Sequence, residues 1–223
     1  MLHGQRLPPP RRGSHLAVRA VAIAAILIAI GAIGAIGSIG ALGCAHAATG
    51  PSAATRAAVE RAEAAELRRD HAAARAAYQQ AIAGAADRDS QVFARREYAS
   101  SLEAWGEVDA AIAQLDAVVA LDPRHAPSWH DLGILRHARG DDRGALAALA
   151  TAESIVPDDP RPHLARAALL WQTGETRGAT AEYEVLLTLE LPQRVREKVE
   201  WALGQLRSHR EQPDAPPAPS PAP

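Results

Sequence analysis

A repeat with a fixed spacing of 34 residues is the feature that most constrains how this chain can fold. The segments WGEVDAAIAQLDAVVALDPRH and RGDDRGALAALATAESIVPDD align without gaps. The matched pairs are Gly106 with Gly140, Ala111 with Ala145, Leu115 with Leu149, and Pro123 with Pro157. Gly174, Ala179 and Tyr183 continue the pattern, and Ala74, Tyr78 and Ala81 precede it. A period of this length predicts a fold made of one supersecondary unit that is stacked several times.

The unit at 126–159 shows what each repeated residue does. Trp129, Leu132 and Gly133 share one face of a helix, and the glycine lets a partner helix come close. Gly140 turns the chain, and the small Ala145 lies where the two helices cross. We therefore expect an antiparallel pair of helices joined by a tight turn.

This unit resembles the tetratricopeptide repeat family, whose signature is W-x2-L-G-x2-Y, then A-x3-F, then P. The matching residues are Trp129, Leu132, Gly133, Ala145 and Pro157, with Leu149 at the phenylalanine position and Arg136 at the tyrosine position. The resemblance implies an all-α, right-handed superhelical solenoid of about four helix-turn-helix units plus a C-terminal capping helix.

The other units match less closely. We expect repeats at 55–88, 92–125, 126–159 and 160–193, with a three-residue spacer at 89–91. The first repeat is degenerate, because Arg69 replaces the glycine of the turn and the closing proline is missing. Residues 194–211 predict a capping helix with Val195, Val199, Ala202 and Leu206 on one face. Residues 212–223 are a Pro/Ala tail that we expect to be disordered.

Composition agrees with a helical array and narrows the function. Hydrophobic residues make up 48% of the chain, but aromatic residues only 4%, which suits closely packed helices better than a β-sandwich. The net charge of −2 gives no basic patch of the kind that nucleic-acid binders carry. The chain has one cysteine, which excludes an internal disulfide and a cysteine-based zinc cluster.

The family resemblance implies a non-catalytic binding scaffold in which the first helix of each pair lines a groove. The groove residues that we predict are Arg96, Ser100, Glu103, His130, Ile134, His137, Arg161, Leu164 and Trp171. Such a groove suits a protein or peptide with an apolar anchor. Trp171 has a second interpretation, in which it packs against the capping helix. A clamp for a C-terminal carboxylate is disfavoured, because Ser100 and Asp131 stand where asparagines would be needed.

No arrangement of residues indicates catalysis, a metal or a cofactor. His130 and His137 lie two helical turns apart, too far for the i, i+4 pair that holds a metal. The segment GAIGAIG lacks the lysine and the serine or threonine of a phosphate-binding loop, and no βαβ unit follows it. We therefore expect no enzyme activity and no cofactor.

The N-terminal segment 1–43 is basic at first and then apolar without charge, which fits a signal peptide or a membrane anchor. As a retained helix, its apolar part is long enough to span a bilayer core. As a leader, it ends in ALGC, which resembles a bacterial lipobox with Cys44 as the lipid attachment site. Residues 44–54 would then be a flexible tether. The five glycines near its end favour the leader, because they weaken a helix that must persist.

The sequence therefore predicts a lipid-anchored repeat protein on the periplasmic side of the bacterial outer membrane, with the inner membrane as the alternative. Its partner would be a protein or peptide of the cell envelope, as for the repeat lipoproteins that help outer-membrane machines assemble. In a second hypothesis the chain is a structural envelope linker that makes contact through its proline-rich tail.

Overall fold

The computed structural model describes residues 50–211, with side chains as far as residue 208. This part of the chain contains helices and no strands, as the sequence predicted. The helices are α2 (Ala53–Leu67), α3 (His71–Gly84), α4 (Arg88–Ala104), α5 (Val108–Leu121), α6 (Ala126–Ala138), α7 (Asp142–Ile155), α8 (Pro160–Gln172), α9 (Thr176–Thr188) and α10 (Gln193–Glu211).

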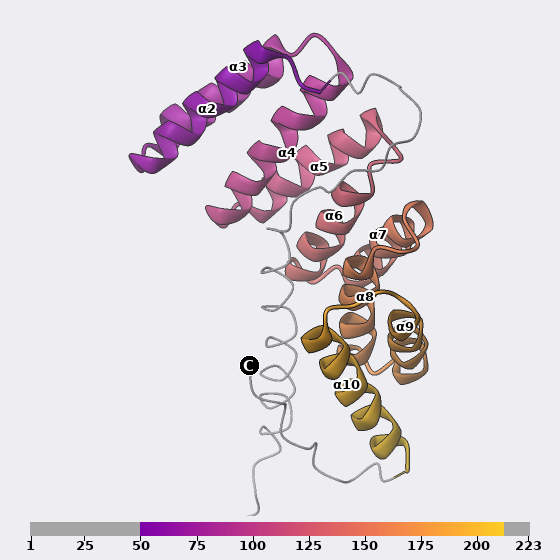
Figure 1. Cartoon of the computed structure of the whole chain (residues 1–223). Helices are drawn as coiled ribbons and strands as arrows, with labels where there is room; N and C mark the ends of the chain where they lie inside the picture. The colour runs from indigo at the N-terminus through magenta and orange to yellow at the C-terminus, as the bar shows by residue number, and fades with distance from the viewer. Residues whose placement is uncertain (1–49, 212–223) are drawn as a thin grey trace, which may run out of the picture. The chain divides into compact units, whose positions relative to one another are not determined.

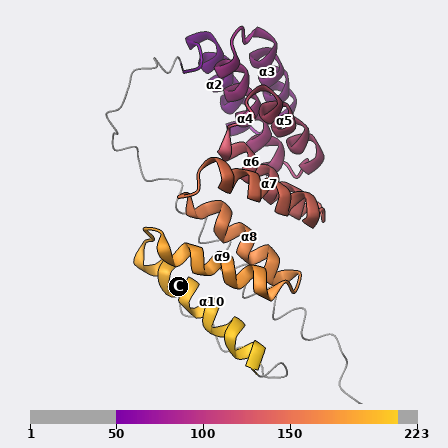
Figure 2. The ribbon, with the colours of Figure 1, turned by 90° about the vertical axis from the view of Figure 1, so that its right-hand side faces the viewer.

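The described residues belong to two compact units, 50–169 and 170–211. In the first unit each helix packs against the next in sequence from α2 to α7, and α2 also contacts α4. The pairs α2–α3, α4–α5 and α6–α7 can be followed in Figures 1 and 2. Consecutive packing of paired helices is the arrangement that the repeat predicted.

The turns within the pairs share one backbone geometry. Gly106, Gly140 and Gly174 have φ of 79°, 87° and 86°, in the left-handed region that glycine enters without steric cost. After Gly140, the Asp141 amide donates to the Arg136 carbonyl oxygen at 2.8 Å. Arg69 takes the same place in the first pair with φ of 59°, so this degenerate repeat keeps the turn without the glycine.

The helix starts are fixed by short polar side chains. Asp70, Asp87 and Asp141 each accept a hydrogen bond from a backbone amide three residues onward. Ser52 does the same for α2 by accepting from the Thr55 amide. The helix therefore begins at Ala53, two residues before the expected start of the first repeat and within the segment expected to be tether.

The packing between α6 and α7 explains the repeated small residues. A Cβ atom on Gly133 would lie 2.5 Å from Cγ of Leu149, closer than side-chain carbons approach one another. Ala145 and Leu149 are both buried. Gly133 therefore lets α6 and α7 cross closely, as the sequence predicted.

The second unit holds the end of α8 with α9 and α10, and α9 packs against α10 (Figure 2). Val199, Ala202 and Leu206 of α10 are buried, in agreement with the predicted apolar face. Trp171 lies 6.2 Å from Trp201 of α10 and 6.3 Å from Tyr183 between ring centroids. The alternative in which Trp171 packs against the capping helix is therefore the one that the structure supports.

Several expectations concern residues outside the described range. The signal peptide or anchor at 1–43, the lipid attachment site Cys44, most of the tether and the tail at 212–223 all lie there. Within residues 50–211, no helix has both the length and the apolar character that a bilayer crossing needs.

Candidate protein-binding face

The predicted groove residues of the first unit come from α4, α6 and the start of α8. Ser100 and Glu103 of α4 are exposed, and Arg96 is half-buried. His130, Ile134 and His137 of α6 are half-buried. We call the surface formed by these six residues, Asp131 and the Asp159–Arg161 pair the charged face.

A carboxylate joins α4 to α6 at the centre of the charged face. Asp131 accepts from Nδ1 of His130 at 3.1 Å, and the Arg96 guanidinium lies 3.7 Å away from its other oxygen. The distance to Arg96 is long for a charged hydrogen bond, so this ion pair is loose. Asp131 thus partly neutralises the cation that the sequence placed in the groove.

Two nitrogen atoms at the same place are buried and have no partner. They are Nε of Arg96 and Nε2 of His130, and the His130 side chain is 12% exposed. A buried polar atom without a hydrogen bond carries a desolvation cost of about 1–3 kcal/mol. A bound molecule that supplies polar atoms here would remove that cost.

The ion pair at the start of α8 is much tighter. Arg161 donates from Nε and Nη2 to both oxygens of Asp159, with the shortest distance at 2.7 Å. Burial opposes ionisation of Asp159, yet the Arg161 hydrogen bonds hold the pKa of its carboxyl below the ordinary value. The Arg161 guanidinium is therefore held in an ion pair with Asp159 and is less available to a partner than that of Arg96.

Carboxyl groups at the edge of the charged face are partly desolvated. Although the Glu103 residue is exposed as a whole, partial desolvation of its carboxyl group raises its pKa, and the nearby charge of Asp131 adds to the effect. Burial likewise raises the pKa of Glu97, against the opposing charge of Arg96, and Glu63 adds to the increase. A cation or a hydrogen-bond donor from a partner would be favoured beside these groups.

His137 and Ile134 complete the α6 part. His137 Nδ1 lies 2.7 Å from Oδ1 of Asp142, the first residue of α7. Ile134 lies between the two histidines in sequence on the same stripe and offers an apolar side chain. The face thus combines one apolar side chain with alternating charges.

Two predicted groove residues are placed differently by the structure. Leu164 is only 3% exposed, so it belongs to the interior and is not offered to a partner. Trp171 lies in the unit of residues 170–211, among the aromatic rings described above. Helical periodicity alone placed both residues with the predicted groove residues. It could not show which sides of α8 are buried by other parts of the chain.

Sequence reasoning also missed part of the face. Asp159 was not singled out, although it is the partner of Arg161. The signal was its place two residues before Arg161 at the start of a helix, where an aspartate commonly accepts a hydrogen bond from the helix's first backbone amides. The Arg161 amide does donate to Asp159 at 3.0 Å.

The geometry can be compared with known proteins. A model of the tetratricopeptide repeat family matches residues 102–169. A search of curated proteins finds no relative of this sequence. The fold is similar to that of a tetratricopeptide repeat protein from Parabacteroides merdae, with a TM-score of 0.62, 12% identity, and coverage of 72% of this chain and 62% of that one.

Two further solved structures share the fold. The MamA protein has a TM-score of 0.59 and 16% identity, with coverage of 71% of this chain and 85% of that one. Pseudomonas aeruginosa PilF has a TM-score of 0.55 and 16% identity, with coverage of 72% and 78%. These likenesses define a helical-repeat protein. The family model matches residues 102–169 as tetratricopeptide repeats, and the solved structures show the same fold over a longer part of the chain.

Proposed function

We propose that this protein is a non-catalytic scaffold that binds a protein partner on the charged face. The tetratricopeptide repeat fold supports a role in protein–protein interaction at the general level. The observation that carries the proposal for this face is the pair of unpartnered buried nitrogens, Arg96 Nε and His130 Nε2. They come from successive pairs of helices. Both atoms are covered, so a polar segment lying across α4 and α6 could satisfy them once the side chains that cover them move aside.

The chemistry of the face favours a partner with mixed polarity. Arg96 Nε needs an acceptor, and Glu103 gains from a donor or a cation because burial disfavours its charged form. Ile134 adds a contact for a small apolar side chain. An extended segment that alternates donors and acceptors along its length fits these groups.

We further propose that the protein works in the bacterial cell envelope, tethered through Cys44. The support is sequence alone: a basic start, an uncharged apolar stretch, and the ALGC that resembles a lipobox. The outer membrane is favoured because Ala45 follows the cysteine, where an aspartate would resemble an inner-membrane retention signal. The alternatives are an inner-membrane anchor, or a linker that acts through its tail.

Photocrosslinking in cells tests the binding face. A photoreactive amino acid replaces Ser100, which is exposed on the charged face, or Ala113, which is exposed on α5. We expect a discrete protein adduct from position 100 and none from position 113. Adding Arg96→Gln should lower the adduct yield several-fold, whereas Arg143→Gln on α7 should leave it unchanged. Equal yields at both positions would overturn the proposal.

The same assay separates the face from the tail. A chain lacking residues 213–223 should keep the adduct at position 100 if the charged face binds the partner. Loss of the adduct would favour the linker hypothesis. The anchor is tested by the mass of the mature N-terminal peptide from membranes: an acylated Cys44 supports the lipoprotein, and an intact peptide from Met1 through Cys44 contradicts it.

A further inference from the structure

Helix α4 has a second face that the proposed function does not use. The three spacer residues at 89–91 fall at its beginning, and α4 is 17 residues long where α6 is 13. The extra residues add a turn at the N-terminus of α4. Arg88, Gln91 and Arg95 recur at helical spacing on this face.

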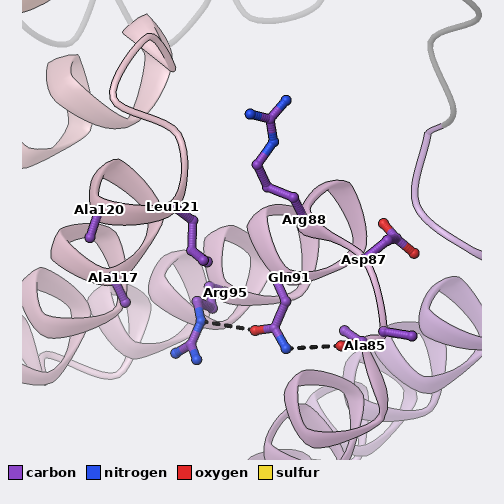
Figure 3. A pocket seen from close by; sticks show the side chains of 9 residues that line it. Ala85, Asp87, Arg88, Gln91, Arg95, Ala117, Ala120 and Leu121 are labelled. Carbon is purple, nitrogen blue, oxygen red and sulfur yellow. Dashed lines mark hydrogen bonds between the residues drawn. The ribbon is translucent and has the colours of Figure 1, made fainter.

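The added turn forms one wall of an open cavity of about 620 Å³ (Figure 3). Its other walls are the loop that follows α3 and the last turns of α5. The lining residues are Ala85, Ala86, Asp87, Arg88, Gln91, Arg95, Ala117, Ala120 and Leu121. The hollow is shallow and open to solvent, so it suits a peptide segment lying on the surface better than an enclosed small ligand.

The apolar part of the cavity is made of small side chains. It consists of four alanines and Leu121, which is 39% exposed. The shallow alanine surface fits small apolar residues such as alanine and proline, and offers no deep slot for a large aromatic ring.

The charged part of the cavity is cationic. Arg95 donates only to neutral amide oxygens, to Gln91 at 3.3 Å and to Gln114 at 3.0 Å, so no carboxylate among the described residues neutralises it. Arg88 has one loose ion pair, with Asp89 at 3.9 Å between exposed side chains. Figure 3 shows Arg88 extending away from Gln91 and Arg95.

The acidic residue of the cavity, Asp87, keeps its negative charge, but its oxygens already accept hydrogen bonds from Ser90. Asp87 accepts from the Ser90 amide at 2.7 Å and from the Ser90 hydroxyl at 2.8 Å. Gln91 is held as well, because its amide nitrogen donates to the carbonyl oxygens of Ile82 and Ala85. The groups left to meet a ligand are therefore the Arg95 cation and the alanine surface.

We propose that this cavity is a second peptide-binding site, specific for a segment with a carboxylate side chain flanked by small apolar residues. The carboxylate would accept from the Arg95 guanidinium, and alanine or proline residues would cover the alanines and Leu121. The site is independent of the charged face. Arg95 and Arg96 are adjacent, and successive side chains on a helix point about 100° apart.

The adjacent arginines give a matched test in the full-length chain. The probe is the fluorescein-labelled peptide Ala-Pro-Asp-Ala-Pro-Ala amide, with the same peptide carrying Asn in place of Asp as its partner. Binding is measured by fluorescence anisotropy. We expect saturable binding of the Asp peptide, and binding of the Asn peptide that is about tenfold weaker, since a charge-assisted hydrogen bond is lost.

The variants decide which face binds the probe. Arg95→Gln should weaken binding of the Asp peptide about tenfold and abolish its preference over the Asn peptide, whereas Arg96→Gln should change neither. Ala120→Glu gives a second variant at an exposed position, and it should also prevent binding by adding bulk and negative charge. Circular dichroism confirms that each variant is folded.

Three results would overturn the proposal. They are an absence of saturable binding to the wild-type chain, equal binding of the Asp and Asn peptides, and an equal loss of binding from Arg95→Gln and Arg96→Gln. Failure here leaves the crosslinking test of the charged face unaffected, because that test depends on other residues.

Discussion

The first and third helix pairs reach the same geometry with different residues. The third, α6–α7, has glycine both at the turn, Gly140, and at the helix crossing, Gly133. The first, α2–α3, has Arg69 at the turn, and the buried residues Ala62 and Tyr78 occupy the positions that match Gly133 and Leu149. A degenerate repeat therefore need not be a distorted one.

The hydrogen bonds of the two turns show why. In the first pair, the Asp70 amide donates to Ala65 at 3.0 Å and the Arg69 amide to Glu66 at 2.7 Å. In the third pair, Asp141 and Gly140 make the equivalent bonds, both at 2.8 Å. Both turns are Schellman motifs, in which the carbonyl groups at the end of the helix are satisfied. Packing and hydrogen bonds determine the backbone conformation of the turn. Glycine only lowers the free-energy cost of adopting the left-handed conformation there.

The largest effect on stability is expected from substitutions at the helix crossings of the first and third pairs. Tyr78→Ala should lower the free energy of unfolding by about 3–5 kcal/mol, because a buried ring is replaced by a cavity. Leu149→Ala at the matching position of the third pair should cost about 2–5 kcal/mol. Urea unfolding followed by circular dichroism measures both, with exposed Gln79→Ala as the control. A small effect at Tyr78 alone would mean that the first pair is loosely packed.

A smaller effect of opposite sign is expected at the turns. Arg69→Gly should raise the free energy of unfolding by about 0.5–1 kcal/mol, because the left-handed conformation costs a side chain more than glycine loses in chain entropy. Gly140→Ala should lower it by about 1 kcal/mol or more, for the same reason. The same urea experiment applies. Destabilisation by Arg69→Gly would show that the arginine side chain itself supports the turn.

The smallest effect concerns pH and the start of α6. His125 caps this helix, since its Nδ1 accepts from the Ser128 amide at 3.3 Å. Its pKa lies below the ordinary value of 6.5, chiefly through burial and also through the charge of Arg96, while Asp122 and Asp131 act in the opposite direction. The His125 imidazole therefore binds a proton more readily in the unfolded chain than in the folded one.

It follows that the contribution of His125 to stability is present above pH 6.5 and is lost as the pH falls through its lowered pKa. His125→Asn keeps a capping oxygen but does not titrate. We expect the wild-type chain to lose more stability than the variant when the pH is lowered from about 7.5 to about 5.5. Parallel pH profiles for the two proteins would contradict this account.

The fold could be predicted largely from sequence, because its determinants are local and periodic. Gly106, Gly140 and Gly174 mark turns wherever the chain repeats, and Gly133 with Leu149 identifies a helix crossing. The apolar face of α10 follows from the spacing of Val199, Ala202 and Leu206 in the same way. Each of these features depends on residues a few positions apart or one repeat apart.

The candidate sites could be predicted only in part, because they depend on contacts between helices. Periodicity placed Arg96 and His130 on one stripe, but it did not show that Asp131 lies between them or that Leu164 is covered. The cavity beside Arg95 was not foreseen either. The three-residue spacer was visible, but its effect on α4 required the position of α5.

A group of contacts around Arg75 joins the first helix pair to the second. Arg75 of α3 donates to the Tyr98 hydroxyl at 3.0 Å and to Glu107 at 2.7 Å, and its guanidinium lies 5.4 Å from the centre of the Trp105 ring. His71 stacks on that ring as well, and Tyr78 stacks on Tyr98. In a repeat protein, the interface between neighbouring pairs sets how far one pair opens without the other. We expect the Arg75 contacts to couple the local opening of α2–α3 to that of α4–α5, so that their backbone amides exchange with solvent as one cooperative unit.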